Sequence, residues 1–301
     1  MPTEPVQAAP QAVEQPGPPG RSSVREIIEG GLEKFLPSCH SEAAIVLDKA
    51  LRDAVFPGGK RLRPRLTLLG AALFGAYDER VLRAACAVEF VHTSSLIIDD
   101  LPCMDDADLR RGNPSLHRAY GESVALLAGI ALLNQAYALF GQNPALIHEA
   151  TQCIGVAGMI GGQAIDLGVA PGDDLLEERD CKTSAMMRLA LTAGALAAGI
   201  PVEQVEPLAE CGQLLGRAFQ ICDDLLDAGR AHHDTGKPPD QDNRHNRPSH
   251  ASRFDPAHSH ARVLEIMAHV RQTLLESYGA TAPVQELLGF IGKLAASVGA
   301  A

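Results

Sequence analysis

Two clusters of aspartate interrupt otherwise apolar stretches of this chain. The first contains Asp99, Asp100, Asp105 and Asp106, and the second contains Asp223, Asp224 and Asp227. Crowded carboxylates repel one another and raise one another's pKa unless a cation neutralises them. Ligand sets made only of oxygen favour hard divalent ions, and Mg²⁺ usually binds through a few carboxylates together with substrate phosphates. The two clusters therefore predict one shared magnesium–diphosphate site.

The spacing within each cluster indicates how its side chains are directed. Asp223 and Asp227 are four residues apart and share one helix face, whereas Asp224 points about 100° away. Pro102 prevents the first cluster from forming one straight helix, so its first two aspartates should end a helix and its last two should lie in the bend beyond. The C-terminal end of a helix disfavours anions, which suggests a compensating cation. A single cluster could be a solvated helix cap, but two together favour a metal site.

Basic residues supply a counterpart to the acids. The segment 57–64 joins a Pro-Gly-Gly turn to three cations, Lys60, Arg61 and Arg63, which would suit phosphate oxygens. A further Arg-Arg pair at 110–111 directly follows the first acidic cluster. Either patch alone is typical of a solvated face. Beside the acids, they predict a diphosphate held by metal on one side and by cationic side chains on the other.

Composition and periodicity predict an all-α, single-domain protein. The 301 residues include no Trp, few aromatics and many apolar segments of helical period. We expect about ten to eleven helices packed as one large bundle around a central apolar cavity. Their approximate spans are 24–36, 42–55, 63–75, 79–100, 115–119, 121–140, 144–168, 174–199, 203–229, 259–278 and 283–298.

Two segments depart from the helical pattern. Residues 1–22 are rich in Pro, Gln and Gly and are expected to form a disordered tail before a domain covering 23–301. Residues 229–258 are polar and rich in His, Asp, Arg and Pro, which indicates a long loop of the kind that is either functional or disordered. A net charge of −11 argues against nucleic acid as a partner. Seven cysteines without a CxxC pair favour a reducing cytoplasm, and no apolar run was expected to be long enough to span a membrane.

The motifs resemble those of a known family. The stretch from His92 to Gly112, HTSSLIIDDLPCMDDADLRRG, closely resembles the first aspartate-rich motif of the trans-isoprenyl diphosphate synthases, the polyprenyl synthetase family. Residues 58–64 look like that family's isopentenyl diphosphate motif. Further matches follow in the expected order at 161–166 (GGQAID), 182–183 (KT) and 219–227 (FQICDDLLD).

This resemblance implies a fold, a reaction and a set of roles. The fold would be that of the isoprenoid synthases, and the protein would use Mg²⁺, three ions per site, to condense isopentenyl diphosphate with an allylic diphosphate of five to fifteen carbons, as a homodimer. Asp99, Asp105 and Asp223 would bind the metal, with Asp100, Asp224 and Asp227 also in the catalytic site. Isopentenyl diphosphate would bind Gly59, Lys60, Arg63, His92 and Arg111. The allylic diphosphate would bind Arg110, Lys182 and Lys237, while Thr183 and Gln220 would face the developing carbocation.

Small residues near the first aspartate suggest the product length. In the family, bulky residues four and five positions before that aspartate close the pocket for the growing chain; here these positions are Ser95 and Ser94. A deeper pocket predicts the C20 product, geranylgeranyl diphosphate. Departures from the family pattern occur at Ile130, where Asp is frequent, and in the 246–250 segment, NRPSH, which replaces a lysine-bearing motif.

Three other functions are compatible with these motifs to differing degrees. A farnesyl diphosphate synthase would stop the same chemistry at C15. A terpene cyclase normally has a different second metal motif and is disfavoured. A catalytically weak regulatory subunit of a partner synthase is suggested by the unusual polar loop, but the intact aspartates oppose it.

Overall fold

The computed structural model describes residues 21–39, 44–167, 181–229 and 255–297. Within these ranges the chain is almost entirely helical. The helices are α1 (Arg21–Phe35), α2 (Ile45–Val55), α3 (Leu62–Ala72), α4 (Glu79–Asp99), α5 (Leu116–Tyr120), α6 (Glu122–Phe140), α7 (Pro144–Ile154), α8 (Met159–Asp166), α10 (Cys181–Ala197), α11 (Val202–Gly229), α14 (Pro256–Tyr278) and α15 (Ala282–Ser297).

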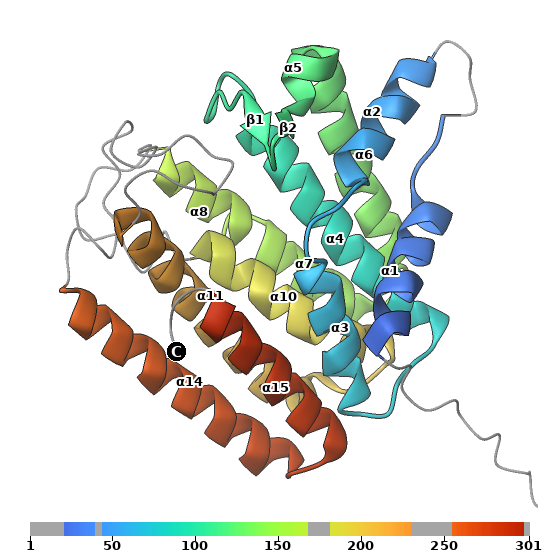
Figure 1. Cartoon of the computed structure of the whole chain (residues 1–301). Helices are drawn as coiled ribbons and strands as arrows, with labels where there is room; N and C mark the ends of the chain where they lie inside the picture. Colours follow the sequence, from blue (N-terminus) through green and yellow to red (C-terminus); the bar gives the residue numbers. More distant parts are fainter. Residues whose placement is uncertain (1–20, 40–43, 168–180, 230–254, 298–301) are drawn as a thin grey trace, which may run out of the picture.

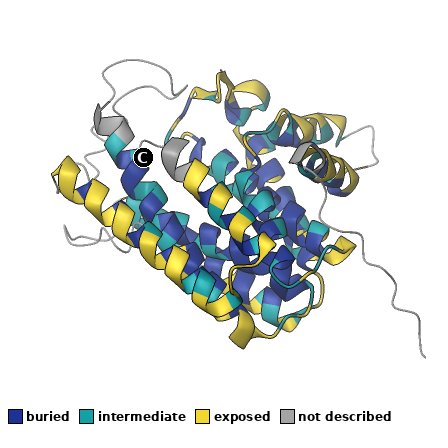
Figure 2. Cartoon of the chain, turned by 60° about the horizontal axis from the view of Figure 1, so that its bottom comes forward, coloured by how far each residue is buried: buried dark blue, intermediate teal, exposed yellow. Residues whose placement is uncertain are grey.

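Helices α4 and α10 form the centre of the bundle. Helix α4 packs against α1, α3, α6 and α10, and α10 packs against α3, α4, α7, α8 and α11. Helix α14 covers α11 from outside, and α15 covers α3 (Figure 1). Figure 2 shows that the inner helices are mostly buried while α14 exposes its outer face.

Glycine permits the closest of these contacts. A Cβ on Gly70 of α3 would lie 2.1 Å from the carbonyl oxygen of Leu191 on α10, and one on Gly194 of α10 would lie 2.2 Å from the carbonyl oxygen of Thr67 on α3. Both distances are far below van der Waals contact, so only glycine allows the two backbones to approach this closely. Helices α3 and α10 are therefore closely packed along this contact.

Local signals place the two ends of α4. The Asp78 side chain accepts hydrogen bonds from the backbone nitrogens of Arg80 and Val81, which caps the first turn. The helix ends at Asp99, as Pro102 predicts, and Asp100 is its C-cap. The first acidic cluster therefore begins at the C-terminal end of a central helix.

The structure corrects three sequence predictions. The expected helix 144–168 is divided into α7 and α8 by residues 155–158, which include two glycines. A short hairpin of β1 (Leu109–Arg110) and β2 (Asn113–Pro114) was not expected. The expectation that no segment is long and apolar enough to span a membrane was also wrong, because α4 and α6 both meet those criteria.

The burial of these two apolar helices differs. The most apolar window of α4 is 67% buried within the fold, as expected for a central core helix, but that of α6 is only 39% buried. Residues 1–20 of the predicted tail and 230–254 of the predicted polar loop lie outside the described residues, so these parts stay predictions. The predicted bounds were wrong at their described ends, because α1 begins at Arg21 and α14 begins at Pro256. All seven cysteines are free thiols.

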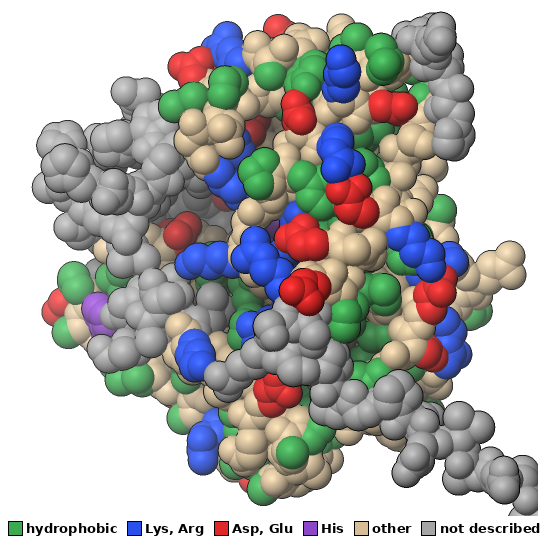
Figure 3. Space-filling view, turned by 45° about the vertical axis from the view of Figure 1, so that its right-hand side comes forward, with side chains coloured by type: hydrophobic (Ala, Val, Ile, Leu, Met, Phe, Trp, Pro, Cys, Tyr) green, Lys and Arg blue, Asp and Glu red, His purple; other side chains and the backbone are tan. Residues whose placement is uncertain are grey.

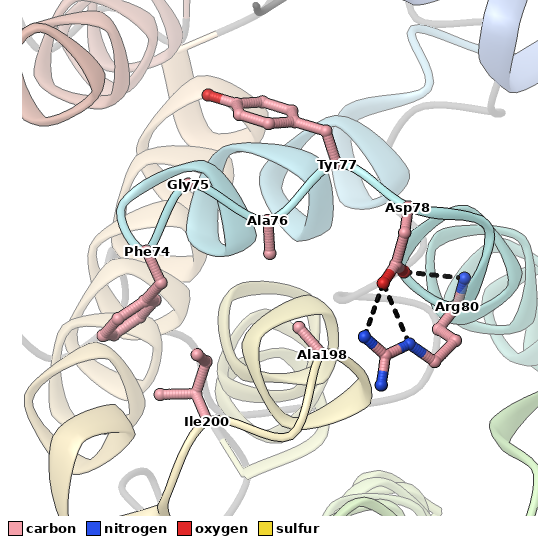
Figure 4. A pocket seen from close by; sticks show the side chains of 8 residues that line it. All are labelled: Phe74, Gly75, Ala76, Tyr77, Asp78, Arg80, Ala198 and Ile200. Carbon is pink, nitrogen blue, oxygen red and sulfur yellow. Dashed lines mark hydrogen bonds and ion pairs between the residues drawn. The ribbon is translucent and has the colours of Figure 1, made fainter. Parts of the chain in front are cut away.

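A cavity of about 340 Å³ lies where the segment joining α3 to α4 meets the end of α10. Figure 4 shows Phe74, Ala76, Ala198 and Ile200 around it, with Asp78 and Arg80 paired at one side. This is the N-terminal end of α4, roughly 30 Å from the acidic end at 1.5 Å per residue. The cavity is therefore separate from the acidic clusters.

Candidate active site

The acidic end of α4 meets α8 and α10 through one lysine. Lys182 Nζ donates to Asp99 Oδ2 at 2.7 Å and also to Gln163 Oε1 on α8. A Cβ on Gly162 would lie 2.5 Å from the backbone nitrogen of Lys182, so glycine is required where α8 approaches α10. The motifs at 161–166 and 182–183 thus meet at the first acidic cluster.

Asp99 is a buried carboxylate that pairs with Lys182. It is buried, and burial together with the nearby charge of Asp105 raises its pKa, although Lys182 and Arg110 act in the opposite direction. The backbone nitrogen of Asp105 donates to the carbonyl oxygen of Asp99 at 2.9 Å, which folds the bend back onto the helix end. The first and third aspartates of the motif are therefore brought together.

Asp100 is paired differently. Its buried carboxylate accepts from Arg110 Nε at 3.1 and 3.0 Å and from the Nη2 atom of the same arginine. Arg110 lies in β1, and Arg111 and Gly112 take positive φ values of 54° and 81° in the turn before β2. The hairpin thus holds Arg110 against the acidic cluster and directs Arg111 elsewhere.

The second acidic cluster lies on α11 beside α10. Asp224 is buried and accepts from Gln220 Nε2 at 2.9 Å, while Gln220 Oε1 accepts from Thr183 Oγ1 at 3.1 Å. Thr183, Gln220 and Asp224 are therefore one hydrogen-bonded chain linking the two helices. Asp223 is half-buried. The side chain of Asp227 and the whole of Lys237 lie outside the described residues.

A group of cationic side chains lies to one side of these acids. Arg63 Nη1 is 3.2 Å from His92 Nε2, and since arginine can only donate, the histidine accepts with this nitrogen. Burial and the charges of Arg63, Arg111, Arg110 and Lys182 hold the pKa of His92 well below its usual value. His92 is therefore neutral at pH 7.

Other residues predicted to bind isopentenyl diphosphate surround this pair. A Cβ on Gly59 would lie 2.9 Å from the guanidinium of Arg111, so the turn and the hairpin meet here. Lys60 is exposed just before α3, and the Nε atom of Arg63 is buried without a hydrogen-bond partner. Burial also lowers the pKa of Arg63 and of Arg111. These donors are arranged to receive an anion.

The third cation of segment 57–64 does not join them. Arg61 is 3% exposed, and its guanidinium is bound by Glu29, Glu89 and the carbonyl oxygen of Val55. The sequence interpretation of three cations around one phosphate was therefore wrong for Arg61. Sequence reasoning matched Gln163 to a family motif without assigning it a role, and it missed Glu89, although an acid three residues before His92 in an apolar stretch was a usable signal.

The residues fit Mg²⁺ in their chemistry. The donors are hard carboxylate oxygens, and burial raises the pKa of Asp99 even though Lys182 and Arg110 act to lower it. Within the described ranges, no group of three or more Asp, Glu, His or Cys side chains is close enough to hold a metal ion alone. Carboxylates from both clusters would therefore hold the ion together with the oxygens of a diphosphate. Figure 3 shows how closely cationic and acidic side chains lie on one face of the molecule.

The two serines assigned to product length have different surroundings. Ser94 is buried, and its hydroxyl donates to the carbonyl oxygen of Gly129 on α6 at 2.8 Å. Ser95 is half-buried and donates to the carbonyl oxygen of His92 within α4. Ser94 therefore lies between α4 and α6, in a tighter place than Ser95.

Comparison with known proteins agrees with this arrangement. The sequence profile of the family described as Polyprenyl synthetase matches residues 45–273. The chain belongs to this family.

Its curated relatives include plant enzymes. It is 40% identical over 210 residues to geranylgeranyl pyrophosphate synthase 11, chloroplastic, of Arabidopsis thaliana, covering 64% of this chain and 59% of that protein. It is 36% identical over 234 residues to the heterodimeric geranylgeranyl pyrophosphate synthase large subunit 2 of the same plant, covering 73% and 61%. The chain thus matches less than two thirds of the length of these relatives.

Solved structures share the fold over almost the whole chain. The apo structure of an FPP/GFPP synthase from Zymomonas mobilis matches with a TM-score of 0.76 and 28% identity, covering 93% of this chain and 98% of that one. The geranyltransferase of Helicobacter pylori, solved with magnesium and isoprenyl diphosphate, matches with a TM-score of 0.75 and 28% identity, covering 94% and 100%. The expected all-α isoprenoid synthase fold is therefore confirmed.

Proposed function

We propose that this protein is a Mg²⁺-dependent prenyltransferase that condenses isopentenyl diphosphate with an allylic diphosphate and releases pyrophosphate. The observation that carries the proposal is the meeting of the buried Asp99 with Lys182 beside the Arg63–His92 pair. One part of the site suits metal and diphosphate, and the adjacent part suits a second diphosphate.

The reaction follows from these two parts. Magnesium supplies charge stabilisation for a departing diphosphate when bound at Asp99, Asp105 and Asp223. Arg110 and Lys182 hold the allylic diphosphate while its C1–O bond breaks and the electron pair leaves with oxygen. The alkene of isopentenyl diphosphate, held by Lys60, Arg63, His92 and Arg111, then forms the new bond to C1. The proton lost from the product goes to the departing diphosphate, and the apolar bundle excludes water from the cation.

The finer proposal is a C20 product, geranylgeranyl diphosphate. It is supported by the small Ser94 and Ser95 and by the names of the plant relatives. Incubating purified protein with Mg²⁺, labelled isopentenyl diphosphate and C5, C10 or C15 primers tests both the condensation reaction and the product length. A C20 product supports it fully, a C15 product supports the reaction and favours the farnesyl alternative, and no product from any primer contradicts the reaction.

Substitution at the serines tests the product-length argument directly. Ser95→Phe, at the less constrained position, should shorten the main product because a ring would fill the pocket. Ser95→Ala is the matched control and should leave product length unchanged. Ser94→Tyr should act similarly, but overpacking between α4 and α6 should also cost about 1–3 kcal/mol of stability. An unchanged product with both bulky variants would contradict the pocket assignment.

We propose a homodimer formed through α6. Leu126, Leu127 and Ile130 on this helix are 44%, 54% and 52% exposed, and the neighbouring α2 exposes Ile45 and Val46. Ile130 is apolar at the position where the family often has Asp, which suits such a contact. Leu127→Glu should lower the mass seen by light scattering from dimer to monomer, whereas Leu264→Glu on the outer α14 should not.

The regulatory-subunit alternative and the cellular location are also testable. One plant relative is named as the large subunit of a heterodimeric synthase. Turnover by the purified chain alone, with Mg²⁺ and no second protein, would exclude a purely regulatory role. We propose a cytoplasmic location from the free thiols, and fractionation of cells expressing the tagged full chain would test it.

A further inference from the structure

Of the three cations in residues 58–63, Arg61 is the one whose side chain faces inward. It takes the left-handed conformation (φ 49°, ψ 41°) as the N-cap of α3. This backbone turn directs its side chain into the protein between α1 and α4, while the neighbouring Lys60 stays exposed. A residue other than glycine with positive φ is uncommon and costs free energy, so the surroundings must hold it in place.

The surroundings of Arg61 account for this conformation. Its Nη1 donates to Glu89 Oε1 at 2.8 Å, its Nε and Nη2 donate to the two carboxylate oxygens of Glu29 at 3.0 Å each, and Nη2 also donates to the carbonyl oxygen of Val55 at 2.8 Å. Although burial opposes the charge, the bonds to Glu29 and Glu89 raise the pKa of Arg61. All three guanidinium nitrogens are engaged with α1, α4 and the end of α2.

The diphosphate-binding turn is folded around this guanidinium. A Cβ on Gly58 would lie 1.9 Å from Cζ of Arg61, so the turn backbone rests directly on the buried group. The next residue, Gly59, is the one that meets Arg111. Displacing Arg61 would therefore displace the turn that carries Gly59 and Lys60.

Glu89 links this anchor to the cationic side chains. It is 3% exposed on α4, one turn before His92, and its charge acts on Arg61, Arg63 and Arg111 together. Only Arg61 is hydrogen-bonded to it among the described contacts, so Arg63 and Arg111 keep donors for a ligand.

We propose that Arg61, fixed by Glu89 and Glu29, is a positioning residue that holds the 57–60 turn in place and thereby sets the affinity for isopentenyl diphosphate without touching it. The assignment of this ligand rests on the proposed function. The anchoring of the turn rests on the contacts of Arg61 alone. The two can therefore be tested separately.

The first test compares two buried arginines. Arg61→Lys keeps the charge but cannot reproduce the forked contacts to three partners. Arg188→Lys makes the same change in a second forked pair, in which Arg188 binds Glu149 at 2.6 and 3.0 Å between α10 and α7. We expect Arg61→Lys to raise the KM for isopentenyl diphosphate about tenfold or more and the KM for the allylic primer less than twofold. Arg188→Lys should lower the melting temperature without moving either KM.

The second test removes no charge. Gly58→Ala places a methyl group where the Arg61 guanidinium lies and should raise the KM for isopentenyl diphosphate in the same selective way. Gly30→Ala on α1 is the matched control, because nothing lies within 4 Å of a Cβ there. The proposal would be overturned if both variants, Arg61→Lys and Gly58→Ala, kept the wild-type KM for isopentenyl diphosphate and for the allylic primer and showed only a lower melting temperature.

A readout that needs no turnover separates this proposal from the proposed function. Hydrogen exchange of the Arg65 amide, which donates to the carbonyl oxygen of Arg61 at 3.3 Å, should be faster in Arg61→Lys than in wild type and unchanged in Arg188→Lys. If the wild-type chain shows no condensation, the proposed function fails, and the exchange rates alone then decide whether Arg61 anchors the turn. Unchanged exchange in Arg61→Lys would overturn the anchoring.

Discussion

The two halves of the site carry opposite charges and are prepared for their ligands in opposite ways. In the acidic half, Asp99 is bound by Lys182 and Asp100 by Arg110, so the protein's own cations contact the carboxylates. In the cationic half, Arg63 contacts a neutral histidine, and its buried Nε has no hydrogen-bond partner.

This difference indicates what each half gains from its ligand. A metal ion in the acidic half must compete with Lys182 for Asp99, so binding there is an exchange of cations. A diphosphate in the cationic half meets donors that are already buried, so binding removes little further water from them. Hydrogen bonds from such donors to a charged acceptor are stronger than neutral ones. The acidic half should therefore control the rate, and the cationic half should control affinity for the second substrate.

Removing a carboxylate of the acidic half should have the largest effect. If Asp99 binds Mg²⁺ as proposed, Asp99→Asn should lower turnover on the order of 10²–10³-fold, because it removes a charge that would hold the cation opposing the departing diphosphate. Steady-state assays over a range of Mg²⁺ concentrations would measure it. Asp108→Asn is the control, since Asp108 lies in the same acidic segment but is 75% exposed and pairs with Arg118 at 2.8 Å. Equal losses in both variants would mean that Asp99 has no special role.

Removing a cation from the other half should have a smaller and more selective effect. Arg63→Gln deletes a charged donor worth about 1.5–3 kcal/mol, which corresponds to roughly a 10–150-fold rise in the KM for isopentenyl diphosphate. Turnover at saturating substrate should change much less. Arg65→Gln is the control on the same helix. Arg65 lies over the ring of Phe290, so its removal should leave the KM for isopentenyl diphosphate unchanged. A fall in turnover without a change in KM would assign Arg63 to the acidic half instead.

The sequence alone predicted much of the site, because the signals there are local. The break at Pro102 placed Asp99 at a helix end, and the expected helix 79–100 contained both His92 and Asp99, as α4 does in the structure. The inward turn of Arg61 could not be foreseen, since it depends on Glu29 and Glu89 from two other helices. A run of three cations looks the same in sequence whether its members point to a ligand or into the core.

The fold was predicted in outline for similar reasons. Helical period and breakers located most helices, but the break between α7 and α8 was missed because no proline marks it. The hairpin at Leu109–Pro114 was also missed, since two residues per strand carry no periodic signal. Its turn uses a positive φ at Arg111, a residue that gives no sequence indication of such a conformation.

The smallest predicted effect is a pH dependence of stability that comes from the cationic half. The pKa of His92 is held well below 6.5 in the folded protein, so between that lowered value and 6.5 the unfolded chain binds more protons. The free energy of unfolding should therefore decrease as the pH falls below about 6.5, by at most about 1.4 kcal/mol per pH unit.

Urea unfolding of wild type and His92→Gln at pH 7.5, 6.5 and 5.5, without metal or substrate, measures this contribution as a difference. The difference in free energy of unfolding between the two proteins should change by only about 0.4 kcal/mol from pH 7.5 to 6.5 and should shift further in favour of the variant at pH 5.5, because glutamine has no proton to gain. Groups common to both proteins, including the acids of the other half, cancel in this comparison. His148→Gln, which removes an exposed histidine from α7, should retain the wild-type slope. If His92→Gln also retained it, the neighbouring cations would not be suppressing protonation of His92, and the contrast between the two halves would lose its electrostatic basis.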